Sequence, residues 1–190
     1  MIGLLGGSFD PIHHGHLIVA QAVLEALSLE ELRFVPARQQ PFKTGLHAAP
    51  AETRARMVAL AIAGEPRFSL ERAELERDGP SYTVDTLRVL RQREPGREFA
   101  ILVGADAARE LPKWREADAL TGLATLVLFA RPGAPVPRLP WPAQVVSVPG
   151  LDISATEIRR RVAAGRPIRY WVPDVVAKCI VAEGLYLTDA

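Results

Sequence analysis

The chain has 190 residues, of which 48% are hydrophobic, so it is long enough to bury one sizeable core. Its formal net charge of +1 gives no overall field that favours nucleic acid or a membrane surface as a partner. The single cysteine, Cys179, excludes an intramolecular disulfide and a thiolate metal cluster, and its apolar neighbours predict a buried helix face. No signal segment is recognisable and no apolar run approaches the ~18 residues of a membrane span, so we expect a cytoplasmic protein.

Strand-like segments alternate with helical ones along residues 1–150. The predicted strands are Ile2–Gly6, Leu32–Val35, Glu98–Val103, Thr125–Phe129 and Gln144–Val148. The predicted helices are His16–Leu27, Glu52–Ala63, Val84–Arg93 and Trp114–Leu120. Nearly continuous apolar strands are typical of a sheet covered on both faces, and the alternation predicts a mainly parallel sheet flanked by helices. In such an α/β fold, ligands bind at the carboxyl ends of the strands, near the point where the strand order reverses.

Residues 151–190 are predicted to be helical. Ser154 and Glu157 have the spacing of a capping box, and Gly165 ends the helix that they begin. Pro173 suits the first turn of a second helix, which Gly184 ends. The proline-rich stretch 131–142 is expected to be a loop because a strand pattern follows it. We therefore predict a single domain over 1–190, with a Rossmann-like core in 1–150 and C-terminal helices in 151–190.

The most informative segment runs from Gly6 to His16 and reads Gly-Gly-Ser-Phe-Asp-Pro-Ile-His-His-Gly-His. Paired glycines between a strand and a helix start leave backbone N–H groups pointing outward, where the helix dipole favours an anion. His13 and His16 are three residues apart and add two donors on one side of the helix. The pattern predicts a nucleotide-phosphate site. A metal site at these histidines is the alternative, although Asp10 is the only acidic residue near them and is expected to fix the turn or cap backbone donors.

A second group of polar residues lies in Ile153–Arg159. Ser154 and Thr156 can present hydroxyls at a helix N-terminus, and Arg159 follows one turn later. Such a cluster suits the β- and γ-phosphates of a triphosphate. Taken alone, the same residues are explained by a plain capping box followed by solvated arginines, so the two motifs must be considered together.

The two motifs together resemble the nucleotidyltransferase superfamily that carries the HxGH signature. Gly-Gly-Ser-Phe-Asp-Pro-x-His-x-Gly-His stands near the N-terminus, and Ile-Ser-x-Thr-x-Ile-Arg near the C-terminus. Three further segments narrow the resemblance to the bacterial nicotinate-nucleotide adenylyltransferase family. They are Gly79–Leu87, Gly104–Asp106 with Leu111–Trp114, and Tyr170–Pro173. The resemblance covers essentially the whole chain and implies a Rossmann-like nucleotidyltransferase fold.

The resemblance also implies a reaction, in which the adenylyl group of ATP passes to nicotinic acid mononucleotide with release of pyrophosphate. The implied catalytic residues are His13, His16 and Arg159. The implied ATP-binding residues are Gly7, Ser8, Phe9, His13, His16, Gly104, Asp106, Ser154, Thr156 and Arg159. The implied mononucleotide-binding residues are Lys43, Tyr82, Thr83 and Trp114. Mg²⁺ is the implied cofactor, held through the ATP phosphates and water and not directly by protein ligands.

Two positions depart from the family pattern. Phe42 stands where the family's lysine-containing loop usually has a histidine, so a phosphate contact from that residue is lost or passes to Lys43, Arg38 or water. Ala155 stands where many relatives carry a second serine, between the two hydroxyls that are retained. We expect the first departure to matter more than the second.

Other functions that share these motifs must be weighed. A phosphopantetheine acceptor keeps the phosphate site, but it does not explain Tyr82, Thr83 and Trp114. A non-catalytic nucleotide sensor could lose its leaving-group contacts, so the intact set argues against it: His13, His16, Thr156 and Arg159. Nucleic acid and membranes are not expected partners because no basic stripe with interleaved aromatic residues is present. The sequence leaves the oligomeric state open and is compatible with a homo-oligomer.

Overall fold

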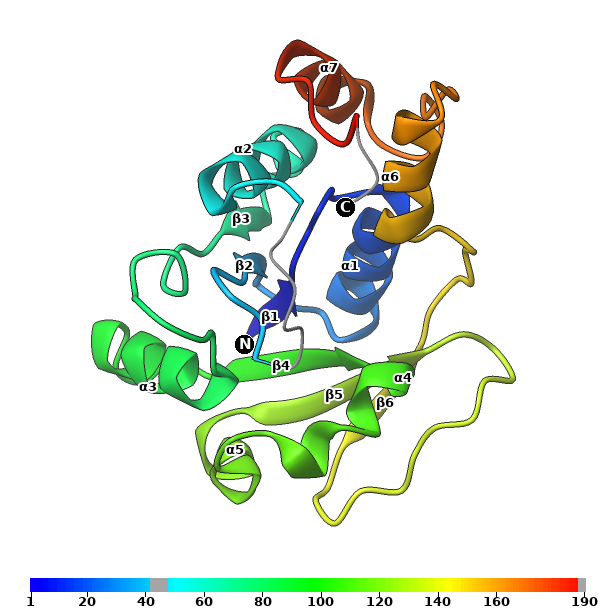
Figure 1. Cartoon of the computed structure of the whole chain (residues 1–190). Helices are drawn as coiled ribbons and strands as arrows, with labels where there is room; N and C mark the ends of the chain where they lie inside the picture. The colour runs from blue at the N-terminus through cyan, green and yellow to red at the C-terminus, as the bar shows by residue number, and fades with distance from the viewer. Residues whose placement is uncertain (42–47, 188–190) are drawn as a thin grey trace.

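A computed structural model describes residues 1–41 and 48–187 as one sheet with helices on both sides (Figure 1). Its six strands are all parallel and lie in the order β3-β2-β1-β4-β5-β6. The strands are β1 (Ile2–Gly7), β2 (Glu31–Pro36), β3 (Phe68–Leu70), β4 (Phe99–Gly104), β5 (Thr125–Ala130) and β6 (Gln144–Ser147). The order reverses between β1 and β4, which places the expected ligand site at the carboxyl ends of these two neighbours.

The helices follow the strands as a parallel sheet requires. They are α1 (His14–Ala26), α2 (Ala51–Ile62), α3 (Thr83–Arg93), α4 (Ala105–Ala108), α5 (Ala117–Leu123), α6 (Ala155–Ala163), α7 (Asp174–Ala182) and the 3₁₀ helix η1 (Leu111–Lys113). Gly165 and Gly184 adopt φ of +65° and +58° just after α6 and α7. These left-handed residues end the two helices, as the sequence predicts.

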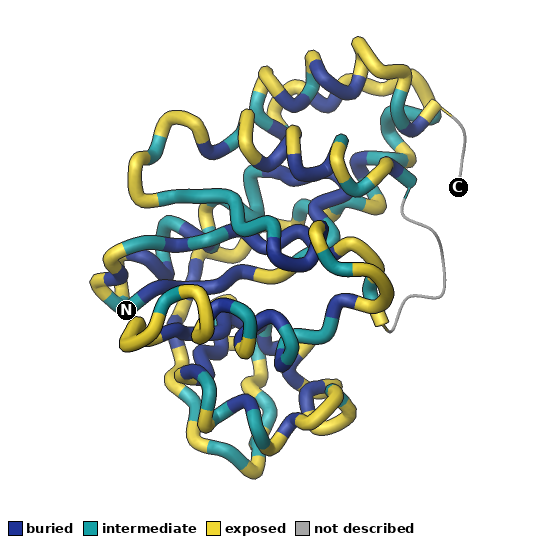
Figure 2. Tube along the Cα trace, turned by 90° about the vertical axis from the view of Figure 1, so that its left-hand side faces the viewer, coloured by how far each residue is buried: buried dark blue, intermediate teal, exposed yellow. Residues whose placement is uncertain are grey.

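Two hydrophobic clusters fill the two sides of the sheet. Side chains of β1 alternate between them, since Leu4 packs on one side and Leu5 on the other. Helices α1, α2, α6 and α7 cover the first side, and α3, α4 and α5 cover the second. Buried stretches run along the central strands and the inner helix faces (Figure 2). The predicted α/β architecture with a doubly covered parallel sheet is thus confirmed.

The C-terminal helices belong to the same core as the sheet. Ile158 of α6 and Cys179 of α7 are buried in the cluster that contains Leu5 of β1 and Val23 of α1. The predicted buried position of Cys179 is therefore confirmed. Within residues 1–41 and 48–187, no helix is long and apolar enough to span a bilayer.

Some elements differ from the prediction. The three-residue strand β3 and the short helices α4 and η1 were not predicted, because none is long enough to show a hydrophobic period. The helix predicted over Trp114–Leu120 is wrong in its start. Trp114 ends η1 with extended backbone, and α5 begins only at Ala117. The left-handed φ of +50° at Glu116 breaks helical geometry between the two.

Candidate active site

The loop between β1 and α1 holds the glycine-rich part of the first motif. Gly7 ends β1, and a Cβ there would lie only 3.0 Å from the Phe9 ring, so a side chain at this position would force the ring to shift. Phe9 itself is buried and adopts a left-handed φ of +49°, which is strained for a residue with a side chain. Its ring meets the His16 ring edge-on at a centroid distance of 5.0 Å. Phe9 thus supports His16 from the core side.

His13 and His16 form a stacked pair at the start of α1. Their ring centroids lie 3.7 Å apart at an interplanar angle of 21°. The backbone N–H of His13 donates to Nδ1 of His16 at 3.3 Å. Because Nδ1 accepts this hydrogen bond, the proton of a neutral His16 stands on Nε2, which is left as a donor.

Burial keeps both imidazoles neutral. Loss of solvent, with a smaller contribution from the charge of nearby His14, lowers the pKa of His13 to about 4. Loss of solvent also lowers the pKa of His16 well below its usual value, with a smaller contribution from His13. At neutral pH the pair therefore offers N–H donors and not two fixed positive charges. An arriving polyphosphate raises both pKa values, because its negative charge favours the protonated form.

Gly15 gives these rings their room. A Cβ at Gly15 would lie 3.0 Å from Nδ1 of His13 and 3.7 Å from the backbone oxygen of Ile153. The second contact shows that the first motif lies against the second, although about 140 residues separate them in sequence. Glycine at this position thus lets the start of α1 pack against both His13 and the residues before α6.

The second motif forms the N-terminus of α6. Ser154 is the N-cap, and its hydroxyl oxygen accepts from the backbone N–H of Glu157 at 3.2 Å. This confirms the Ser154 half of the predicted capping box and leaves the hydroxyl hydrogen of Ser154 as a donor. Thr156 is exposed one position into the helix. Arg159 donates from Nη1 to the backbone oxygen of Asp10 at 2.8 Å. This contact joins the two predicted phosphate motifs directly.

The segment after β4 supplies the neighbouring wall. β4 pairs with β1, and Leu102 stands opposite Leu5 near the carboxyl ends of both strands. Gly104 then caps the short helix α4, whose first turn carries the exposed side chain of Asp106. Gly104 and Asp106 therefore follow the carboxyl end of β4, the strand that neighbours β1 at the switch point.

Three of the predicted mononucleotide-binding residues, Tyr82, Thr83 and Trp114, lie on the other face of the sheet. Tyr82 is the N-cap of α3, an 11-residue helix, and Thr83 is its first residue. Two backbone N–H groups at the N-terminus of the helix therefore lie beside these residues. Tyr82 and Trp114 are both half-buried and pack against the same hydrophobic cluster. The guanidinium of Arg115 lies over the Tyr82 ring, 4.9 Å from its centroid.

Sequence reasoning missed the polar residues beneath this helix start. The Ser81 hydroxyl accepts from the backbone N–H of Arg38 at 3.0 Å, which fastens α3 to the end of β2. Buried Glu74 accepts from the Thr86 hydroxyl at 2.8 Å, and burial raises the pKa of Glu74. Nη1 of Arg77 is buried without a hydrogen-bond partner in the described part of the chain. Only burial could have distinguished these side chains from ordinary surface residues.

Two further points bound the site. Lys43, together with Phe42, lies outside the described residues, so its predicted phosphate contact stays a prediction. Across residues 1–41 and 48–187, no group of three or more His, Cys, Asp and Glu side chains is placed to hold a metal ion.

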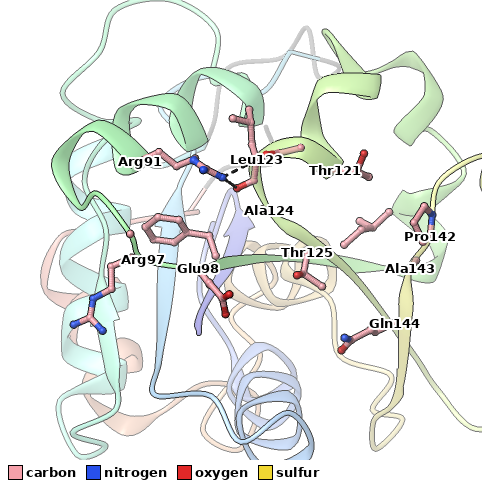
Figure 3. Close-up of a pocket in the computed structure, with 14 residues that line it drawn as sticks. Arg91, Arg97, Glu98, Thr121, Leu123, Ala124, Thr125, Pro142, Ala143 and Gln144 are labelled. Carbon is pink, nitrogen blue, oxygen red and sulfur yellow. Dashed lines mark hydrogen bonds between the residues drawn. The ribbon is translucent and has the colours of Figure 1, made fainter.

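A hollow of about 650 Å³ lies elsewhere (Figure 3). Its lining includes Phe99, Thr125 and Gln144, which begin three parallel strands. The hollow therefore opens at the edge of the sheet opposite to the two phosphate motifs. Arg91, on its wall, donates to the backbone oxygen of Leu123 at 3.0 Å and is already engaged.

Comparison with known proteins agrees with this geometry. Residues 4–161 match the model of the cytidylyltransferase-like family, so the fold and the paired phosphate motifs define a nucleotidyltransferase. A probable nicotinate-nucleotide adenylyltransferase of Thermus thermophilus is 50% identical over 185 residues, which cover 97% of this chain and 98% of that one. A protein of the same description from Roseiflexus is 46% identical over 194 residues. The chain belongs to the nicotinate-nucleotide adenylyltransferase family.

Solved structures agree on the fold. The nicotinic acid mononucleotide adenylyltransferase of Plasmodium falciparum, solved in complex with NaAD, superposes with a TM-score of 0.81 at 20% identity. The match covers 99% of this chain and 98% of that one. The Rossmann-like nucleotidyltransferase fold implied by the motifs is thus confirmed.

Proposed function

We propose that the protein transfers the adenylyl group of ATP to nicotinic acid mononucleotide, giving nicotinic acid adenine dinucleotide and pyrophosphate in NAD biosynthesis. The observation that carries this proposal is the contact of 2.8 Å between Arg159 and the backbone oxygen of Asp10. This contact brings the N-terminus of α6 to the N-terminus of α1, at the point where the strand order reverses. The chain is also 50% identical to a probable enzyme of this activity.

The reaction needs no nucleophile from the protein. The 5′-phosphate of the mononucleotide attacks the α-phosphorus of ATP in line, the bond to the β-phosphate oxygen breaks, and pyrophosphate leaves. Catalysis then depends on positioning the reactants and on neutralising charge on the phosphoryl oxygens. Nε2–H of His16 and the imidazole of His13 donate to the α- and β-phosphates. Backbone N–H groups of Gly7, Ser8 and Phe9 contribute the anion-binding turn.

The leaving pyrophosphate is held from α6. Ser154 and Thr156 donate hydroxyl hydrogens to its phosphate oxygens. Arg159 adds a permanent positive charge next to the Thr156 hydroxyl. Lys43 adds a second cation from the connection between β2 and α2. Mg²⁺ arrives as the complex with ATP, because the triphosphate and water satisfy an ion that dehydrates reluctantly. His13, His16 and Arg159 are thus the residues that we place in the transfer itself.

The acceptor binds between α3 and η1. Backbone N–H groups near Tyr82 and Thr83 face the nicotinate carboxylate, since a helix start favours an anion over a neutral amide. Trp114 stacks on the positively charged pyridinium ring, a contact worth about 0.5–2 kcal/mol. Gly104 allows close approach at the end of β4, and Asp106 accepts from a ribose hydroxyl or orders the water around Mg²⁺. We place the reaction in the cytoplasm, in one domain with a core over 1–150 and helices over 151–190.

The direct test measures pyrophosphate release from ATP with purified protein. We expect release that depends on both Mg²⁺ and nicotinic acid mononucleotide. Equal or faster turnover with nicotinamide mononucleotide would contradict the acceptor and leave the reaction class standing. Calorimetric titration with each mononucleotide, with and without an unreactive ATP analogue, then measures the preference for acid over amide.

A nucleotide sensor with the same fold is separated by isotope exchange. We expect label to pass between pyrophosphate and ATP when the finished dinucleotide is present. Tight ATP binding with no exchange and no pyrophosphate release would favour the sensor.

A further inference from the structure

A positive charge is buried beside the phosphate loop, on an element that neither motif contains. Arg54 of α2 is fully buried. Its guanidinium donates to the backbone oxygens of Ser8, Ala37 at 2.7 Å and Ala49 at 3.2 Å. Burial lowers the pKa of Arg54, whereas the charge of Asp10 raises it. A buried charge of this kind is stable only when it is paired and hydrogen-bonded, so Asp10 and the carbonyls are structural requirements.

Asp10 joins the same group from the other side. Its carboxylate accepts from the Tyr186 hydroxyl at 2.7 Å and from the backbone N–H groups of Ala48 and Ala49 at 2.8 and 3.2 Å. Its backbone oxygen accepts from Arg159. Asp10 therefore touches three distant parts of the chain through one residue.

Tyr186 completes the group from beyond α7. It is buried, and its φ of +62° is left-handed and strained for a residue with a side chain. Such a conformation persists when surrounding contacts require it. The hydrogen bond to Asp10 is one of these contacts, and burial together with Asp10 raises the pKa of the Tyr186 hydroxyl, which therefore remains a donor.

We propose that Asp10, Arg54 and Tyr186, here called the anchor cluster, position Arg159 relative to the loop that carries His13 and His16. The proposal rests on the proposed function, because it assigns Arg159 and the histidines to the same polyphosphate. Arg54 fixes the loop through Ser8, Asp10 fixes Arg159 through its carbonyl, and Tyr186 holds the Asp10 carboxylate. None of the three touches the reacting atoms; they are positioning residues.

Positioning is a large part of phosphoryl transfer. A displacement of about 1 Å in a group that aligns the reactants can cost about 100-fold in rate. A smaller shift, caused by the loss of one hydrogen bond in the anchor cluster, is expected to cost roughly 10-fold. Since the cluster acts through Arg159, the loss should appear in kcat and in the KM for ATP and should spare the KM for the mononucleotide.

The sharpest variant is Tyr186→Phe, which keeps the buried ring and removes only the hydroxyl that donates to Asp10. Tyr170→Phe is the matched control, since Tyr170 is 81% exposed near the same end of the chain. Ile180→Val is a second control because Ile180 is buried in α7 and its truncation loosens the core while every hydrogen bond of the anchor cluster keeps its donor and acceptor. All variants are assayed at a temperature where circular dichroism shows them fully folded.

A double-mutant cycle with Arg159→Met tests the path of the effect. If the cluster acts through Arg159, Tyr186→Phe lowers activity about 10-fold in the wild-type background. In a protein that already carries Arg159→Met, Tyr186→Phe then causes no further loss. Losses that multiply in the double variant would overturn the proposal. So would an equal rise in both KM values, a loss matched by Ile180→Val, or no loss in Tyr186→Phe.

The proposed function can fail separately. The same double-mutant cycle can be measured without any acceptor, by calorimetry of the affinity of each variant for an unreactive ATP analogue. Weakened binding in Tyr186→Phe that vanishes beside Arg159→Met supports the anchor cluster even if the wild-type protein fails to turn over nicotinic acid mononucleotide. Unchanged binding of the analogue in Tyr186→Phe, with normal turnover, overturns the anchor cluster and leaves the proposed function intact.

Discussion

The proposed phosphate half and the proposed pyridine half of the site, called the phosphate half and the pyridine half below, are built in different ways. The phosphate half joins segments that are far apart in sequence through buried groups, among them Asp10, Arg54 and Tyr186. The pyridine half uses half-buried aromatic side chains, Tyr82 and Trp114, on short segments of α3 and η1. The phosphate half is thus held by buried side chains of the core, whereas the pyridine half lies at the surface of the core.

This difference indicates that catalysis and the choice of acceptor depend on different parts of the molecule. Transfer of a nucleotidyl group needs a rigid polyphosphate cradle, because catalysis depends on alignment. Recognition of the acceptor needs contact area and one anion-binding helix start, which side chains at a surface can provide. We therefore expect changes in the phosphate half to lower kcat, and changes in the pyridine half to raise one KM.

The largest effect is expected in the phosphate half from His16→Ala. Removing one preorganised donor should lower kcat by about 100- to 1,000-fold with little change in the fold. Steady-state pyrophosphate release measures the loss, and His14→Ala is the control, because His14 lies next to the stacked pair but is not part of it. Near-normal turnover in His16→Ala would remove His16 from the mechanism.

The burial of the phosphate half also predicts a pH effect on stability. The pKa of His13 is about 4 in the folded protein and about 6.5 when unfolded. The unfolded chain therefore takes up the proton first, so the free energy of unfolding falls as the pH drops from about 6.5 to about 4. The contribution is about 1.4 kcal/mol per pH unit, or roughly 3 kcal/mol in total.

His13→Gln should flatten this part of the pH profile. Urea unfolding of the wild type and the variant, repeated between pH 4 and pH 7, measures the two slopes. His14→Gln serves as the control because it removes an imidazole from the same helix start without emptying the stacked pair. Parallel slopes in wild type and His13→Gln would show that His13 is not held neutral by burial.

The support under the pyridine half is expected to matter less. Ser81→Ala removes the acceptor for the backbone N–H of Arg38 and should lower the free energy of unfolding by about 1–3 kcal/mol. It should also raise the KM for the mononucleotide more than the KM for ATP, because Ser81 precedes Tyr82. Chemical denaturation and kinetics check both effects, with exposed Ser147→Ala as the control. A matching loss in Ser147→Ala would contradict the assignment.

The smallest effect is expected from Trp114→Ala. Loss of a cation–π contact of about 0.5–2 kcal/mol should raise the KM for the mononucleotide about 2- to 30-fold and spare the KM for ATP. Trp141→Ala is the matched control, since Trp141 packs against the same hydrophobic cluster from the loop before β6. Equal changes in both KM values would mean that Trp114 only packs.

The fold was predictable where the pattern is long and repetitive. The apolar run Phe99–Val103 and the period of α1 and α2 identify their elements because each contributes many residues to a buried face. The three residues of β3 were not predictable, since their strand character comes from pairing with β2. The start of α5 was misplaced because a single left-handed residue, Glu116, interrupts an otherwise helical pattern.

The site was predictable only where motifs mark it. His13, His16, Ser154 and Arg159 stand in recognisable spacings, and the structure brings their segments together. Arg54 carries no such mark, because an arginine in an amphipathic helix resembles the many solvated arginines of this chain. Its importance depends on complete burial beside Asp10, which no local pattern encodes.

One aromatic contact series has a practical consequence for experiments in solution. Phe68, Phe34, Phe9, His16 and His13 touch in succession, with centroid distances of 5.4, 5.7, 5.0 and 3.7 Å. Ring currents from an edge-on phenyl displace the resonances of the imidazole protons that face it. The resonances of the carbon-bound protons of His16 therefore report on the packing of the loop between β1 and α1, and we expect them to shift when a nucleotide binds, without any attached label.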